Sequence, residues 1–132
     1  EEWTFSDKLY EELVSSDKSD GQALNNYSYI LAERGIKLRT ALNMAEKAIE
    51  LEPVNPAYLD TIGWIYFKQK KFDKALKYIE QSISKNPENA VVLEHLGDVL
   101  MKVDRPKDAR TYYRKALAID KDNDRLQKKV KE

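Results

Sequence analysis

The chain has 132 residues with 23 basic and 23 acidic side chains, so its formal net charge is zero. A neutral chain has no general attraction to nucleic acid or to an anionic membrane surface, and we expect neither as its main partner. The lack of cysteine excludes disulfides and thiolate metal sites, and no apolar run approaches the roughly 20 residues of a membrane-spanning helix. Only four glycines and four prolines interrupt the chain, which favours long helices.

The first predicted element is a helix over residues 5–16, which places Leu9, Leu13 and Val14 on one face. Its register matches the second helix of the repeated units that follow. We therefore expect residues 1–20 to be the remainder of a preceding unit, truncated from a longer array. The alternative is a private N-terminal cap that packs on the first unit. In either case Trp3 and Phe5 are expected to cover the exposed end.

The next hundred residues repeat one pattern. Gly63 and Gly97 are 34 residues apart, and a shift of that length superposes residues of similar size along two whole segments. An earlier segment fits the same pattern if one extra residue lies in the turn between Gly35 and Leu38. The predicted units are residues 21–55, 56–89 and 90–123.

Each unit has the period of two helices. Leu59, Ile62 and Tyr66 share one helical face, and a second apolar stripe follows after a short polar break. Asn55 stands where it can cap a helix that begins at Pro56. Asn89 and Asn123 hold the same position in the later units. The spacing predicts an antiparallel helix pair in every unit.

Small residues indicate where the two helices of a pair approach each other. Gly63 and Gly97 fall in the middle of predicted helices, where glycine is about 1 kcal/mol worse than alanine. We expect the second helix of the same unit to press against these positions, which have no side chain. Ser28 holds the equivalent place in the first unit. Small side chains at the next crossing have the same role: Ala41, Ala75 and Ala109.

Taken together, these positions resemble the tetratricopeptide repeat (TPR) family. The family pattern falls on Leu59, Ile62, Gly63, Tyr66, Ala75, Ile79, Ser82 and Pro87, and again on Leu93, Leu96, Gly97, Leu100, Ala109, Tyr113 and Ala116. The resemblance implies an all-α fold: a right-handed superhelix of antiparallel helix pairs, with about three repeats plus flanking helices. The sequence departs from the pattern with leucine for tryptophan at 59 and 93, Ser82 for alanine, and Lys121 for the closing proline. Its general character is bacterial.

The last segment, residues 124–132, is predicted to be a C-terminal capping helix. Only Leu126 and Val130 are apolar, so the helix has a single apolar face and is otherwise polar, as a terminal capping helix requires. Lys128, Lys129 and Lys131 are interpreted as a solvated face. The alternative is that these lysines attract an acidic partner.

No arrangement of residues indicates catalysis, and we expect no enzyme activity, no metal and no cofactor. His95 is the only histidine, it has no cysteine to pair with, and no motif marks a serine nucleophile. We interpret His95 as a surface or groove residue. The run Lys68, Lys70, Lys71 and Lys74 is interpreted as solvating a turn, not as contacting nucleic acid.

In TPR proteins the first helix of each pair lines a concave face. By register, the resemblance places the following residues there: Asn25, Tyr29 and Ala32; Asp60, Trp64 and Phe67; Glu94, Asp98 and Met101, with Asn26, Thr61 and His95 nearby. Trp64 and Phe67 are surplus to the core of their own unit, so we interpret them as exposed binding anchors. The alternative is that they pack against the next repeat.

The acids Asp60, Glu94 and Asp98 in this set predict a protein or peptide partner with apolar and basic character. Family members that clamp a carboxylate need inward lysine, arginine and asparagine, so the resemblance implies that such a clamp is absent. We expect a non-catalytic scaffold or adaptor module. There are two alternatives: the chain is a self-association module, or it is the regulatory arm of an enzyme. The sequence names no compartment; a soluble fragment of the bacterial cytoplasm or periplasm is the expectation.

Overall fold

A computed structural model describes residues 21–131, and the predictions made for residues 1–20 lie outside this range. The described part of the chain is entirely helical, without strands. Its helices are α2 (Gly21–Arg34), α3 (Leu38–Leu51), α4 (Pro56–Lys68), α5 (Phe72–Lys85), α6 (Ala90–Lys102), α7 (Pro106–Ile119) and α8 (Asp124–Lys131).

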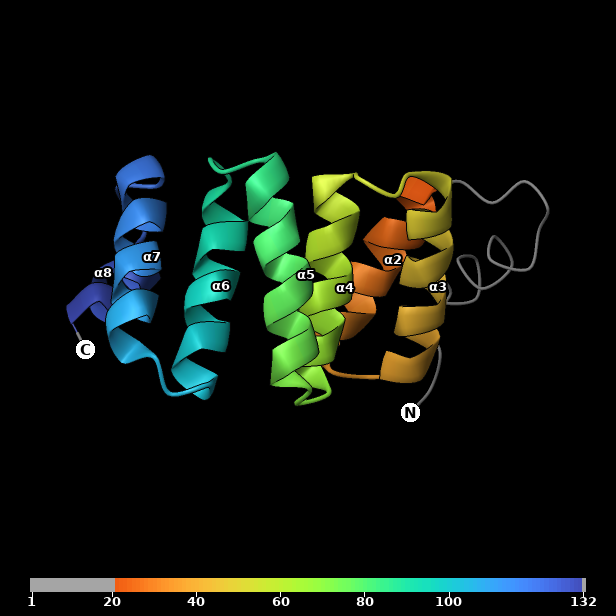
Figure 1. Cartoon of the computed structure of the whole chain (residues 1–132), viewed down its shortest axis with the longest axis horizontal. Helices are drawn as coiled ribbons and strands as arrows, with labels where there is room; N and C mark the ends of the chain where they lie inside the picture. Colours follow the sequence, from red (N-terminus) through yellow and green to blue (C-terminus); the bar gives the residue numbers. More distant parts are fainter. Residues whose placement is uncertain (1–20, 132) are drawn as a thin grey trace.

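The helices form three antiparallel pairs in a row, followed by α8 (Figure 1). Each pair falls within one of the ranges 21–55, 56–89 and 90–123. The first helices α2, α4 and α6 make one layer and the second helices α3, α5 and α7 the other. One continuous core runs along the row between the layers, from Leu24 in α2 to Leu126 in α8. This is the predicted all-α solenoid.

Asparagine caps start the helices, as predicted. The side-chain oxygen of Asn55 accepts hydrogen bonds from the backbone N–H groups of Ala57 and Tyr58, at 2.9 and 3.2 Å. Asn89 and Asn123 accept one backbone N–H each at the starts of α6 and α8. An asparagine in this position satisfies donors that have no partner inside the helix. The repeated asparagine therefore fixes where α4, α6 and α8 begin.

The turn inside each pair explains the one-residue irregularity of the repeat. The turn after each first helix contains a residue with left-handed φ: Gly35 at 68°, Lys70 at 64° and Asp104 at 63°. One residue then separates Lys70 and Asp104 from the next helix, whereas Ile36 and Lys37 both follow Gly35. Lys37 is itself left-handed, at 49°. The extra residue is therefore in the predicted turn.

The mid-helix glycines allow close packing within a pair, as predicted. A Cβ atom added to Gly63 would lie 2.5 Å from Ile79 Cγ1 and 3.2 Å from the backbone oxygen of Ala75. A Cβ added to Gly97 would meet the ring of Tyr113. Ser82, which replaces the family's alanine, donates a hydrogen bond of 2.7 Å to the carbonyl of Pro56. This departure therefore adds a contact between α4 and α5.

Candidate functional site

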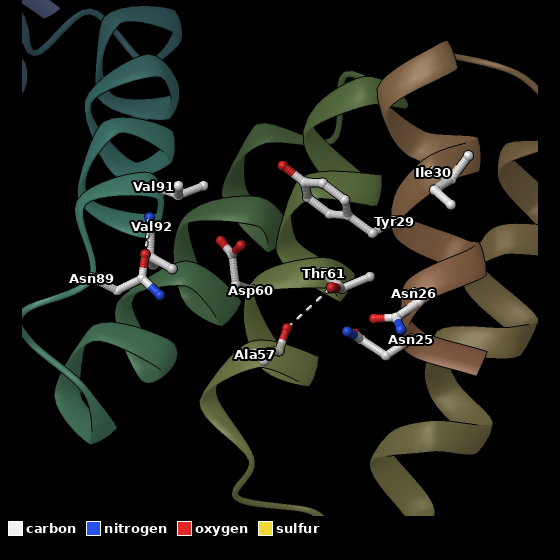
Figure 2. Close-up of a pocket in the computed structure, with 10 residues that line it drawn as sticks. All are labelled: Asn25, Asn26, Tyr29, Ile30, Ala57, Asp60, Thr61, Asn89, Val91 and Val92. Atoms are coloured by element: carbon white, nitrogen blue, oxygen red, sulfur yellow. Dashed lines mark hydrogen bonds between the residues drawn. The ribbon is translucent and has the colours of Figure 1, made fainter. Parts of the chain in front are cut away.

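The first helices of the three pairs surround a hollow of about 550 Å³ (Figure 2). We call it the aliphatic hollow; its lining residues are Asn25, Asn26, Tyr29, Ile30, Ala57, Asp60, Thr61, Asn89, Val91 and Val92. Ile30 and Val91 lie on opposite sides of it, with Tyr29 between them in the view of Figure 2, and are 43% and 51% exposed. Exposed apolar side chains that gather around one hollow, unlike single scattered ones, are typical of an interaction surface.

A second hollow of about 410 Å³ adjoins the first, because Tyr29 and Val91 line both. We call it the polar hollow; its lining residues are Tyr29, Glu33, Trp64, Lys68, Val91, Glu94, His95, Asp98, Arg125 and Lys129. Burial, together with the nearby acids Glu33, Asp60 and Glu94, raises the pKa of Tyr29 to about 12. The Tyr29 hydroxyl between the two hollows is therefore neutral at physiological pH.

Trp64 is a packing residue, and the expectation that it is exposed is wrong. Its side chain is 6% exposed. The indole stacks on His95 with ring centroids 3.8 Å apart and on Phe67 with centroids 4.5 Å apart, and its N–H donates to Glu33 at 2.6 Å. These contacts reach both neighbouring repeats. Packing against the next repeat, the alternative drawn from the sequence, describes Trp64 correctly.

The sequence interpretation of His95 is a surface or groove residue. His95 lines the polar hollow but is only 6% exposed, so the surface part of that interpretation is wrong. Its Nδ1 lies 3.0 Å from a carboxylate oxygen of Asp60 in the preceding repeat. The indole of Trp64 covers one face of the imidazole ring. The histidine is held by an acid and an aromatic ring, and its contacts join α4 to α6.

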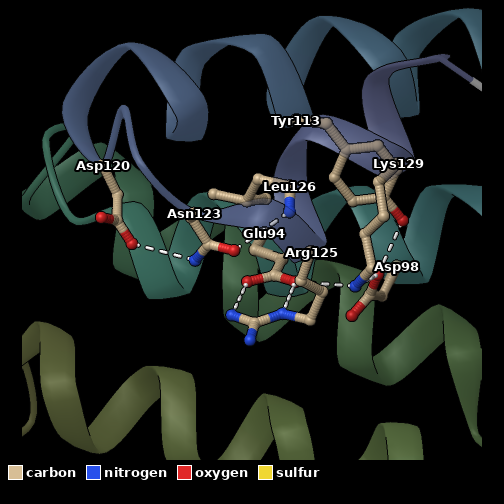
Figure 3. Close-up of polar contacts among 8 residues, drawn as sticks. All are labelled: Glu94, Asp98, Tyr113, Asp120, Asn123, Arg125, Leu126 and Lys129. Carbon is tan, nitrogen blue, oxygen red and sulfur yellow. Dashed lines mark hydrogen bonds and ion pairs between the residues drawn. The ribbon is translucent and has the colours of Figure 1, made fainter.

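The acids of the third repeat are neutralised by α8 (Figure 3). Arg125 donates two hydrogen bonds to Glu94, at 2.7 and 2.8 Å. Lys129 donates to Glu94 at 2.7 Å and to Asp98 at 2.9 Å, and Asp98 also accepts a bond from the Tyr113 hydroxyl. For Lys129 the prediction of a solvated face is therefore wrong, since its ammonium group turns inward to these acids.

The charges of this cluster stabilise one another. Burial alone raises the pKa of Glu94, but the hydrogen bonds from Arg125 and Lys129 outweigh burial and lower it to about 2. For Lys129, burial lowers the pKa, and the bonds to Glu94 and Asp98 reverse this and raise it. Glu94 is consequently ionised at any physiological pH, and its charge is already matched within the chain.

Six of the nine residues predicted to line the concave face lie around the two hollows. They are Asn25, Tyr29, Asp60, Trp64, Glu94 and Asp98. Ala32 is wholly buried in the core, so its placement on that face is wrong. Phe67 stacks beside Trp64 but lines neither hollow, and Met101 is exposed away from them.

Sequence reasoning missed Ile30, Val91, Arg125 and Lys129. Ile30 and Val91 follow Tyr29 and Ala90 directly and lie outside the apolar stripes of their helices. An apolar residue off the stripe is a signal that could have identified them.

Within residues 21–131, no helix is long and apolar enough to cross a membrane. No cluster of three or more histidine, aspartate or glutamate side chains within the same range could hold a metal ion. The two hollows are lined by apolar side chains at the rim, by amide and hydroxyl groups, and by paired charges. These groups suit binding, and they form no nucleophile–base arrangement.

Solved structures share this fold. The first TPR domain of human RPAP3 superposes with a TM-score of 0.76 at 18% identity, over 84% of this chain and 87% of that one. YrrB, a TPR protein, superposes with a TM-score of 0.76 at 22% identity, over 92% of this chain and 62% of that one. Identities this low show the fold alone.

Sequence comparison gives the family. A TPR repeat-containing protein of Pseudomonas aeruginosa is 35% identical over 66 residues, which are 50% of this chain and 11% of that protein. The chain thus matches a small part of a much longer bacterial relative. The family model described as tetratricopeptide repeat matches residues 66–131, which span the end of α4 through α8. The chain belongs to the tetratricopeptide repeat family.

Proposed function

We propose that this chain is a non-catalytic protein–protein interaction module that holds a peptide segment of a partner against the first helices of its repeats. The observation that carries the proposal is the exposed pair Ile30 and Val91 at the mouth of a hollow of about 550 Å³. Two exposed aliphatic side chains on opposite sides of one hollow gain free energy when apolar groups cover them. Apolar side chains of a bound peptide are such groups.

Relatives with the same fold support this proposal. One similar structure is described as the first TPR of Spaghetti (RPAP3) bound to an HSP90 peptide; it superposes with a TM-score of 0.78 at 18% identity. YrrB is described as having an unusual peptide-binding site. Other proteins with this fold thus bind peptides, and we propose the aliphatic hollow as the site in this chain.

The proposed partner segment is apolar. The basic character expected from Asp60, Glu94 and Asp98 loses its physical basis, because His95, Arg125 and Lys129 already pair with these acids. A basic peptide would have to displace those groups and would gain little net charge interaction. An aliphatic side chain meets no such competition at Ile30 and Val91.

A displayed library of random linear peptides provides the test. Selected peptides are measured by fluorescence polarisation against the parent chain, Val91→Ser and Val54→Ser. Val54 is 64% exposed in the turn before α4 and lies outside both hollows, so it is the matched control. Losing about 1–1.5 kcal/mol of apolar burial predicts roughly tenfold weaker binding for Val91→Ser and no change for Val54→Ser. Equal affinities for all three chains would refute the site.

The alternatives give different results in the same samples. A self-association module would show a molar mass that rises with concentration in light scattering, and Val91→Ser would lower that mass if the hollow is the contact. A regulatory arm of an enzyme would bind a segment of that enzyme and is a special case of the proposal. A strict monomer that selects no peptide would contradict both binding and self-association.

A further inference from the structure

The second helix of the last pair, α7, carries a row of cations on its solvent side. Lys107 and Arg114 lie opposite the buried side of the helix, and Arg110 and Lys115 flank them. We call this set the basic face: Lys107, Arg110, Arg114 and Lys115. None of these residues lines either hollow, so the surface is separate from the candidate site described above.

Three of these cations have no acidic partner in the part of the chain that the structure describes. The single acidic residue of α7, Asp108, pairs with Arg105 at 2.8 Å. Lys107 and Arg114 form no ion pair with any residue of the range 21–131, and the same is true of Lys115. All three side chains are exposed. Their charges are therefore available to a partner.

The basic character is specific to the third pair. The position of Arg114 in α7 holds Glu80 in α5 and Glu46 in α3. Arg110 and Arg114 are four residues apart, and like charges at this spacing destabilise a helix. The acid that the earlier pairs have at this position would avoid that repulsion. A local arrangement that disfavours the helix is expected where the surface has another use.

Acidic residues bound the basic face at both ends. Asp104 precedes α7, and Asp120, Asp122 and Asp124 follow it. The 14 residues of α7 span about 21 Å. A nucleic acid or a membrane surface extends well beyond this length and would meet the flanking acids, which repel it. A short acidic segment of a protein covers the basic face alone, so this is the class of partner that the surface fits.

The chain itself contains a strongly acidic segment. Residues 1–20 hold seven acidic and two basic side chains, whereas residues 104–131 hold five acidic and ten basic ones. The zero net charge of the chain thus combines an acidic start with a basic end. The acidic segment is joined to α2, which lies at the opposite end of the row from α7 (Figure 1). A second copy is therefore the more direct source of acids for the basic face.

We propose that the basic face binds residues 1–20 of a second copy of this chain. Each copy then keeps an acidic segment for one neighbour and a basic face for another, so the contact joins two different surfaces and can repeat from copy to copy. Because the basic face lines neither hollow, this association goes beyond the proposed function and does not depend on it.

Binding of a synthetic peptide provides the test. A fluorescently labelled peptide with the sequence of residues 1–20 is titrated with the full chain, and its anisotropy is measured at about 50 mM and about 500 mM salt. The reversed variant carries Lys107→Glu and Arg114→Glu. The control carries Arg39→Glu and Lys77→Glu, which change the net charge equally at exposed positions of α3 and α5.

We expect the parent chain to bind the peptide at low salt and to bind it about tenfold more weakly at high salt. The reversed variant should bind at least about tenfold more weakly than the parent at low salt, because two attractions become repulsions. The control should stay within about twofold of the parent. Since Arg114→Glu also removes the repulsion from Arg110, the reversed variant should melt no lower than the parent.

A charge swap in the peptide separates recognition from a general loss of structure. The changes Glu11→Lys and Glu12→Lys in the peptide should abolish binding to the parent and restore binding to the reversed variant. In light scattering at low salt, the molar mass of the parent should rise with concentration, and the reversed variant should stay monomeric. Val91→Ser should bind the peptide like the parent, because Val91 lies in the aliphatic hollow.

Other results would overturn this proposal and leave the proposed function to its own test at Val91. A peptide that does not bind the parent at low salt, or that binds the parent and the reversed variant equally, contradicts it. A reversed variant that melts lower and is not rescued by the swapped peptide makes the basic face structural. Binding of single-stranded RNA or of phosphatidylserine vesicles through Lys107 and Arg114, without binding of the peptide, assigns the face to that partner instead.

Discussion

Replacing Gly97 with alanine adds one methyl group at the closest contact between α6 and α7. The added Cβ would lie 2.6 Å from Tyr113 Cδ1 and 2.8 Å from Cζ, far inside van der Waals contact. Something in the pair must therefore move. The ring of Tyr113 is buried, and its hydroxyl donates to Asp98 at 2.6 Å, so the ring is held at both ends.

Two opposing effects set the magnitude. Alanine is a better helix former than glycine by about 1 kcal/mol, which by itself would stabilise α6. Overpacking a well-filled core costs about 1–3 kcal/mol, and straining the bond between Tyr113 and Asp98 adds about 1 kcal/mol. The net expectation is a loss of about 2 kcal/mol. For a chain of this size that lowers the melting temperature by roughly 6–8 °C.

Urea denaturation followed by circular dichroism measures this loss in two backgrounds. In Tyr113→Leu the ring is gone, so adding the methyl group at Gly97 should cost at least 1 kcal/mol less than in the parent chain. A Gly97→Ala variant that is more stable than the parent would show that helix propensity decides at this position. An equal cost in both backgrounds would show that the ring is not what the glycine accommodates.

Three further predictions concern single contacts. The pKa of Glu94 is lowered from an ordinary 4.5 to about 2, so its stabilisation is complete above pH 4.5 and is lost as the pH falls toward 2. Since its partner Arg125 is largely exposed, we expect about 1–2 kcal/mol, measured as a smaller acid-induced loss of stability in Glu94→Gln than in the parent. Trp64→Ala should cost about 3 kcal/mol in urea denaturation, and an unchanged midpoint would contradict its role in the stack. Asn89→Ala should cost about 1 kcal/mol through loss of the cap of α6, whereas Asn89→Ser should recover most of it.

Sequence reasoning predicted the features of the fold that depend on neighbours close in the chain or on a fixed period. The caps at Asn55 and Asn89 act on N–H groups two or three residues away, so the local sequence is enough to place them. Gly63 and Gly97 mark the close contact between the two helices of a pair. Because the glycine recurs at the same position of two units, the sequence alone indicates that contact. The turn between Gly35 and Leu38 was predicted to hold an extra residue because that residue breaks the period.

The side chains of the candidate site were harder to predict because their partners lie 31 to 35 residues away. Register correctly assigned Trp64 and Glu94 to the first helices, and both line the polar hollow. It gave no account of what the following repeat would place against them. His95 covers the indole, and Arg125 and Lys129 reach back to the carboxylate. Each residue was judged within its own unit, whereas in a stack of repeats its environment is set by the neighbouring unit.

The same dependence on neighbours determines which groups are left for a partner. An inward polar residue of one repeat is satisfied only if the next repeat presents a matching donor at the corresponding position. Asp60 and Glu94 find such donors in His95 and Lys129. Asn25 faces a position held by Thr61, whose proton is used within its own helix. The acids in the sequence are therefore a poor guide to the ligand of a repeat protein. A more useful signal is an inward polar residue for which the next repeat supplies no hydrogen-bond donor.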